Sequence, residues 1–192
     1  MPGQMEADWE FEIGNDAPII EARWEGFVDL RVQPNRAGDL VETLQLPGLA
    51  DALARLNAPT SPIWTCKTDV FVPDQIDPDE LDATSDKASH AQACYIDLLP
   101  GLDQRWDVPA KAEAACKEMC ARLRDVPMRR CRVDFVIRQA HIEPGLDDLG
   151  ATAYLMACGP TQWEARSCLS GCLSLFAELI VPEQRQSTGA PV

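Results

Sequence analysis

Alternation of apolar and polar positions predicts the strands of this chain. Apolar Trp9, Phe11 and Ile13 alternate with acidic residues, the period-two pattern of a half-buried strand. A longer alternation runs over 20–32 and follows the turn cluster at 14–16, so we expect the two strands to pair as an antiparallel hairpin. Further runs predict strands over 63–72, 91–98, 130–140 and 150–157.

Apolar residues at helical spacing predict three helices, near 47–57, 109–124 and 160–180. Each helix follows a pair of strands, and connections between consecutive elements stay short. The order ββα, ββα, ββα therefore predicts an α+β fold of repeated ββα units. We expect a mainly antiparallel sheet of about six strands, with the three helices on one face.

Short sequence matches between the units favour an internal duplication. CKTDVFV from Cys66 resembles CRVDFVI from Cys131, and four further pairs of segments match in the same order. The alternative is that similar elements merely share a composition. We expect a single α+β domain over 1–183, with units at about 8–58, 59–126 and 127–183, and a flexible tail over 184–192.

Charge and hydropathy limit the classes of partner. The 192 residues carry a net charge of −14, which repels nucleic acid over most of the surface. No apolar run approaches the roughly 20 residues of a membrane span, and the first residues lack the pattern of a secretory signal. These features predict a cytoplasmic protein that binds neither nucleic acid nor membrane.

Eight cysteines are the first candidates for chemistry. Cys116 and Cys120 lie one helical turn apart, as do Cys168 and Cys172, so two helices could in principle offer four thiolates to a metal. These positions fall on the apolar helix stripes, however, and buried cysteine packs as a small hydrophobic side chain. We therefore expect core packing, with no metal and no cofactor.

The histidines and the acidic segment give no stronger signal. His141 has nearby carboxylates but too few converging ligands for a metal site, and we expect it at a solvated strand end. The segment 74–86 is rich in carboxylates but lacks the central glycine and terminal glutamate of a calcium loop. We expect a solvated loop there. The sequence has no phosphate-binding glycine motif and no nucleophile elbow.

The outward sheet face is the remaining candidate, because an aromatic residue recurs there in each unit beside charged residues. Exposed aromatic residues rimmed by charge often mark a partner or ligand surface. The alternative is that the rings form cross-strand pairs that only stabilise the sheet. The predicted binding surface consists of Phe27, Asp69, Tyr95, Asp97, Arg132, Asp134 and Tyr154.

Two functions fit this surface. The first is a non-enzymatic binding or assembly protein, which uses the helix-free face to meet a second copy or a protein partner. The second is a small-molecule-binding or hydrolytic domain with a pocket on the same face, where Asp69, Asp134 or His141 serves as acid or base. The sequence names neither a substrate nor a partner.

Overall fold

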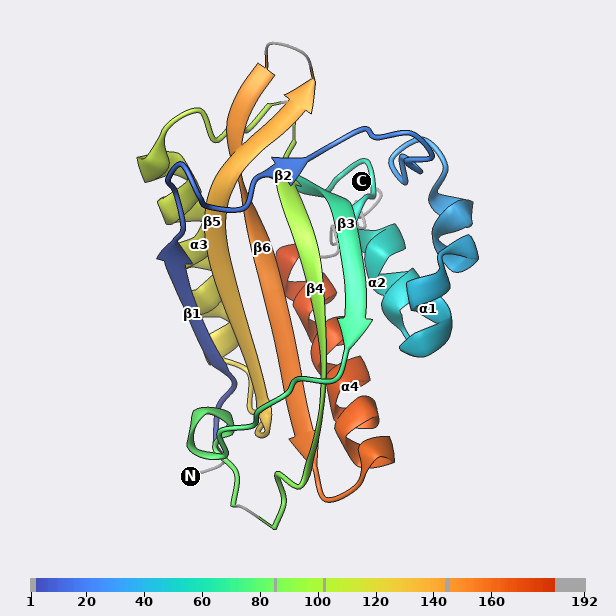
Figure 1. Ribbon diagram of the computed structural model, residues 1–192, viewed down its shortest axis with the longest axis vertical. Coiled ribbons are helices and arrows are strands. Elements are labelled where there is room, and N and C mark those ends of the chain that lie inside the picture. The colour runs from blue at the N-terminus through green and yellow to red at the C-terminus, as the bar shows by residue number, and fades with distance from the viewer. Residues whose placement is uncertain (1–2, 85, 102, 144–145, 182–192) are drawn as a thin grey trace, which may run out of the picture.

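A mixed six-stranded sheet forms the centre of the computed structural model, which describes residues 3–84, 86–101, 103–143 and 146–181 (Figure 1). The strands are β1 (Glu6–Phe11), β2 (Ile20–Glu21), β3 (Ile63–Phe71), β4 (His90–Pro100), β5 (Cys131–Glu143) and β6 (Leu146–Gly159). Their order across the sheet is β1-β5-β6-β4-β3, and the short β2 also pairs with β5. The sequence thus predicted an α+β fold with the correct number of strands. The expected tail over 184–192 lies outside the described residues.

The described residues contain four α-helices and two 3₁₀ helices rather than three helices. They are η1 (Pro34–Asp39), α1 (Val41–Gln45), α2 (Leu49–Leu56), η2 (Asp79–Leu81), α3 (Pro109–Arg124) and α4 (Gln162–Ile180). None of the described helices has both the length and the apolar character needed to cross a bilayer. The extra helices lie in segments that the periodicity analysis did not assign to helices.

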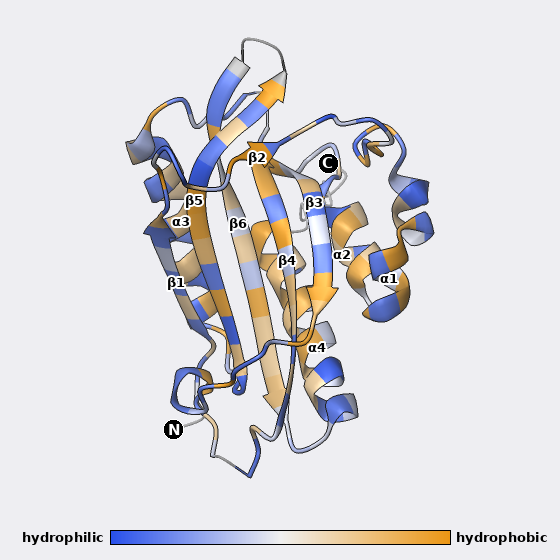
Figure 2. Ribbon diagram, in the orientation of Figure 1, coloured by the Kyte–Doolittle hydropathy of each residue, from blue (hydrophilic) through white to orange (hydrophobic). Residues whose placement is uncertain are grey.

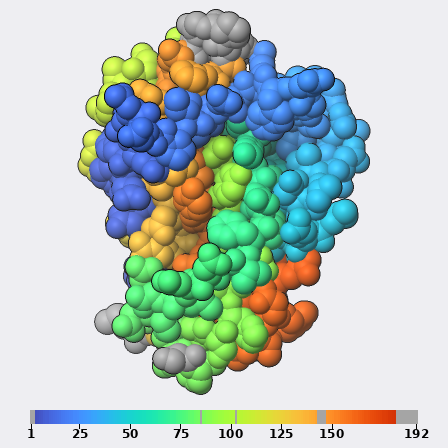
Figure 3. Space-filling view, viewed as in Figure 1, coloured from blue at the N-terminus to red at the C-terminus, as the bar shows by residue number. Residues whose placement is uncertain are grey.

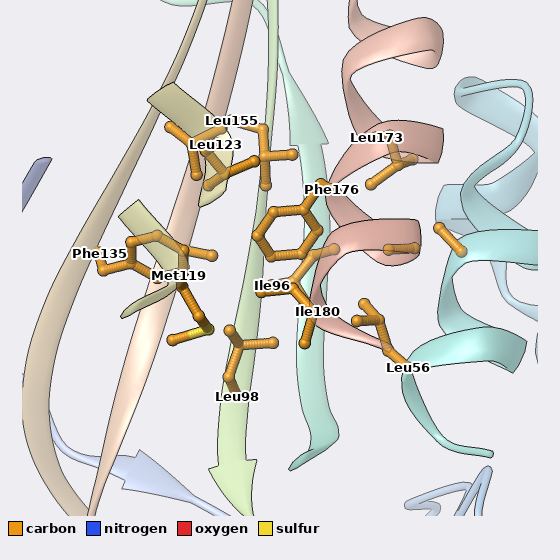
Figure 4. Close-up of a cluster of buried hydrophobic side chains, with 14 of the residues drawn as sticks. Leu56, Ile96, Leu98, Met119, Leu123, Phe135, Leu155, Leu173, Phe176 and Ile180 are labelled. Atoms are coloured by element: carbon orange, nitrogen blue, oxygen red, sulfur yellow. The ribbon is translucent and has the colours of Figure 1, made fainter. Parts of the chain in front are cut away.

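The longer helices pack on one face of the sheet (Figure 1). Helix α3 contacts β1, β5 and β6, α4 contacts β4, β5 and β6, and α2 packs against α4 and β3. The main apolar core lies between these layers, where Phe135 of β5 stacks on Phe176 of α4 with a centroid distance of 6.1 Å (Figure 4). Residues of opposite hydropathy alternate along β3 and β5 (Figure 2), so one side of these strands faces the core and the other is polar.

The sheet is mixed because its first two strands do not form the expected hairpin. Strands β1 and β2 each run parallel to β5, whereas β3–β4, β4–β6 and β5–β6 are antiparallel pairs. The structure therefore does not confirm three repeated ββα units. Alternation along a strand determines which residues face the core, but it does not identify the neighbouring strand.

The long strand predicted over 20–32 is also wrong beyond Glu21. Arg23 has a φ of 70° and Gly26 a φ of 87°, so the chain leaves the extended conformation there. The segment then lies across the helix-free face, held by a second apolar cluster of Ile20, Trp64, Leu99 and Ala140. Trp24 and Phe27, which alternation placed on opposite faces, contact each other here with a centroid distance of 5.0 Å.

The acidic segment 74–86 is anchored rather than fully solvated. Leu81 of η2 is completely buried, and its carbonyl accepts a hydrogen bond of 3.0 Å from the backbone N–H of Arg130. A third apolar cluster of Leu81, Ala88, Ala91 and Cys158 attaches the segment to the helix-free face of β4 and β6. The prediction missed this contact because a single leucine among carboxylates gives no periodic pattern.

Gly150 of β6 lies where the crossing segment touches the sheet, and its lack of a side chain is required. An added Cβ would lie 2.9 Å from Ile20 Cδ1, from the Leu98 carbonyl oxygen and from Leu99 Cδ2. Gly150→Ala should therefore lower the free energy of unfolding by about 1–3 kcal/mol through overpacking, measured by urea titration. Gly14→Ala is the control, because no atom lies within 4 Å of its added Cβ. Equal effects of the two changes would contradict the packing described here.

Candidate functional site

Two segments cross the helix-free face and leave a hollow between them. Residues 18–24 lie over one end of the sheet and η2 lies at the other, and Figure 3 shows the hollow with atoms of β4 and β6 at its floor. The hollow comprises two adjoining cavities of about 580 Å³ and 530 Å³, which share Arg138 and Tyr154 as lining residues. We refer to the two cavities together as the trough.

Strand pairing aligns four of the predicted residues in one row. Asp69 of β3 pairs with Tyr95 of β4, Tyr95 with Tyr154 of β6, and Tyr154 with Asp134 of β5. Side chains at paired positions share one face of a sheet, so all four project from the helix-free side. The two tyrosine rings contact each other, with centroids 6.0 Å apart. The row thus brings together residues that are 85 positions apart in the sequence.

Asp97 lies one row further along β4 and forms part of the floor of the trough. It is only 8% exposed, and its Oδ1 atom accepts a hydrogen bond of 2.6 Å from the Thr152 hydroxyl. Burial raises the pKa of Asp97, although the Thr152 hydrogen bond and the charges of Arg138 and Lys67 act in the opposite direction. Among the described residues, no basic side chain forms an ion pair with Asp97.

A β-bulge in β3 lies opposite Asp97. The register of β3 against β4 shifts between Thr65 and Thr68. Cys66 and Lys67 of β3 therefore lie together opposite the single residue Asp97 of β4. Bulges re-aim side chains and are common beside functional sites. Here Lys67 lines the first cavity, while the Cys66 thiol donates a hydrogen bond of 3.0 Å to the Glu21 carbonyl oxygen. Burial, together with the charge of Asp97, raises the pKa of the Cys66 thiol to about 12, which keeps it protonated.

Arg138 of β5 connects the two cavities through its hydrogen bonds. Its Nε and Nη2 atoms donate to Glu12 Oε2 at 2.9 Å and 2.5 Å, so the two charges largely neutralise each other. Its Nη1 atom donates to the Thr152 hydroxyl oxygen at 2.9 Å and to the Tyr154 hydroxyl oxygen at 3.1 Å. The guanidinium thereby fixes Thr152, which in turn donates to Asp97.

Carboxylates outnumber cations along the trough. Its basic lining residues are Lys67, Arg132 and Arg138, and Arg132 donates to Asp134 at 2.6 Å. Its acidic lining residues are Asp8, Glu10, Glu12, Glu21, Glu80, Asp97 and Asp134.

Five of the seven predicted surface residues line the trough. Tyr95, Asp97 and Tyr154 line the first cavity, and Arg132, Asp134 and Tyr154 line the second. Asp69 belongs to the same row of residues but lines neither cavity. Phe27 is not on a strand, and its ring packs against Trp24 and Trp64 over the end of the sheet.

Sequence reasoning missed several residues of the site. Trp24 is 45% exposed and lines the first cavity, although the alternation expected over 20–32 gives it the same parity as the buried Ile20. Thr152 has the same parity as Tyr154, so the sequence pattern could have revealed it. Glu12 reaches the trough because β1 pairs with β5, a pairing that the pattern did not predict.

The helix cysteines and His141 lie away from the trough. Cys116, Cys120 and Cys172 are buried, and Cys168 is half-buried with its sulfur 3.3 Å from that of Cys131. Within the described residues, no group of three or more potential ligands is arranged to hold a metal ion. His141 lines neither cavity, and its Nδ1 atom lies 2.6 Å from Asp147 Oδ1 near the far end of β5.

Comparisons of the chain with protein-family models, with curated proteins and with solved structures found no match. The geometry and electrostatics of the trough are therefore the basis for any inference about function.

The raised pKa of Asp97 should make the free energy of unfolding depend on pH. The native state retains this proton to a higher pH than the unfolded chain does, so the contribution of Asp97 to the free energy of unfolding falls as the pH rises above about 3.8. Asp97→Asn removes this dependence and still accepts the Thr152 hydrogen bond. The stability of the variant relative to the wild type should therefore increase between about pH 4 and about pH 8, as measured by urea unfolding. A constant difference over this range would show that burial does not perturb Asp97.

Proposed function

We propose that the protein binds a small molecule in the trough, with Asp97 at its floor. The observation that carries this proposal is a carboxyl group that is nearly fully buried, lacks an ion-pair partner among the described residues and borders a cavity. Burying a charged or polar group without full compensation destabilises a fold. Such groups are concentrated at binding and catalytic sites, where a ligand supplies the missing interactions.

The composition of the first cavity also supports a ligand. Trp24, Ile19 and Tyr95 offer apolar and aromatic surface, while Lys67 and Asp97 offer a small number of polar groups. Pockets for small molecules combine mainly apolar walls with a few polar groups that fix the orientation of the ligand. The proposal concerns binding alone, and no reaction is assigned to these side chains.

The shape of the helix-free face favours a small molecule over a second sheet. Residues 18–24 and η2 lie over the face on either side of the tyrosine rings, so a flat partner surface would meet these segments first. Self-association through this face, the other function that the sequence suggested, is therefore one of the outcomes that the experiment below distinguishes.

The test is a titration of ¹⁵N-labelled protein, followed by amide chemical shifts, with four probes: an aliphatic amine, a carboxylate, a phenol and a sugar. At least one probe should shift the amides of Tyr95, Asp97 and Tyr154 in a saturable manner. If no probe shifts them, or if light scattering shows a dimer whose dissociation alone moves these amides, the proposal is wrong.

Tyr95→Ala should weaken binding of the shifting probe about tenfold or more, because it removes a ring from the trough. The melting temperature should fall by no more than in Phe71→Ala, a matched loss of a ring on the same face outside the trough. A loss of probe binding that is equal in the two variants would identify a general effect on folding.

A further inference from the structure

The charges that remain unpaired in the trough point to the class of ligand, provided that the trough binds one as proposed. Arg138 is paired with Glu12, and Arg132 with Asp134, so both guanidinium groups are already neutralised. Asp97 and Glu10 have no ion-pair partner among the described residues, and each lines one of the two cavities. Lys67 is the one lining cation without an ion pair among the described residues, so an anionic ligand would find a single free cation, while a cationic ligand would find free carboxyl groups in both cavities.

Aromatic surface and net charge favour a cation as well. The rings of Tyr95, Tyr154 and Trp24 line the first cavity, and the faces of aromatic rings attract ammonium groups. Arg138 already uses this interaction, with its guanidinium carbon 5.7 Å from the centre of the Tyr154 ring. A net charge of −14 raises the local concentration of small cations around the protein.

Strand register sets the length of such a ligand. Asp97 pairs with Thr152, Thr152 with Val136, and Val136 with Glu10, so Asp97 and Glu10 terminate one row across four strands. Three strand spacings of about 4.8 Å separate their backbones by roughly 14 Å. Thr152 and Val136 line the cavities between the two carboxyl groups, and the Arg138 guanidinium, which is paired with Glu12, lies beside them and donates to the Thr152 hydroxyl oxygen.

We propose that the ligand is a linear aliphatic oligoamine that lies across β4, β6, β5 and β1. One ammonium group binds the carboxyl group of Asp97 and another binds that of Glu10. The methylene chain between them contacts Val136 and the edge of the Tyr154 ring.

A series of linear diamines from diaminopropane to diaminododecane tests this arrangement by calorimetry and amide shifts. Affinity should rise with chain length to an optimum at intermediate length, near diaminooctane, and then level off or fall. Asp97→Asn should weaken binding of the optimal diamine about tenfold or more, because a charge-assisted hydrogen bond is lost. Asp69→Asn removes a carboxylate from the same face outside both cavities and should leave the affinity unchanged.

The far end of the trough has its own control pair. Glu10→Gln should weaken the optimal diamine several-fold but leave a simple monoamine unaffected. Glu6→Gln removes the same charge from the same face of β1, outside the cavities, and should change neither affinity. Lys67→Met should strengthen diamine binding, because it removes a competing ammonium group beside Asp97.

The opposite probe is a linear dicarboxylate of the length of diaminooctane. If the dicarboxylate or a neutral probe shifts the trough amides and the diamines do not, the oligoamine class is wrong while ligand binding in the trough stands. If probes of every charge leave these amides unchanged, both proposals fail. Diamine binding that is insensitive to Asp97→Asn, or independent of chain length, would overturn the bridging arrangement.

Discussion

The alternation of side chains along β4 determines both the stability of this protein and its candidate site. Ile96 and Leu98 project into the main core beneath the helices, whereas Tyr95 and Asp97 project to the other side. A core on one face alone would leave the opposite face to solvent. Two small apolar clusters cover the ends of this second face, where they hold residues 18–24 and η2 against the sheet. The polar centre thereby lies in an open hollow between two segments.

The properties of the site depend on parts of the chain that are distant in sequence. Arg138 is fixed by Glu12, which follows β1, and Asp97 is held by Thr152 of β6. The bulge in β3 turns Lys67 toward the same place. Because these elements come from the whole length of the chain, local changes in any of them alter the electrostatics around a single carboxyl group. Burial raises the pKa of Asp97, and Thr152, Arg138 and Lys67 each oppose that rise.

Local sequence patterns were sufficient for much of the fold. Helix α3 occupies the predicted residues, because Pro109 marks its first turn and an apolar stripe runs along its length. The alternation of residues along β4 and β6 correctly predicted that Tyr95, Asp97 and Tyr154 share the helix-free face of the sheet. The parallel pairing of β1 with β5 could not be predicted, since it depends on contacts more than 120 positions apart. The position of Trp24 on the helix-free face could not be predicted for a different reason. Arg23 adopts a positive φ, which is uncommon for arginine and cannot be inferred from the sequence pattern.

Glu12 is the counter-ion of the Arg138 guanidinium at the junction of the two cavities. A shortened form of the chain that lacked Glu12 would leave Arg138 cationic and unneutralised, with only hydroxyl oxygens as partners. If the trough binds a ligand as proposed, its preference would then shift toward phosphates and carboxylates, although no residue on the central strands had changed. In the proposed binding site, the preference for ligand charge therefore depends partly on Glu12, which follows an edge strand and lies outside the central strands.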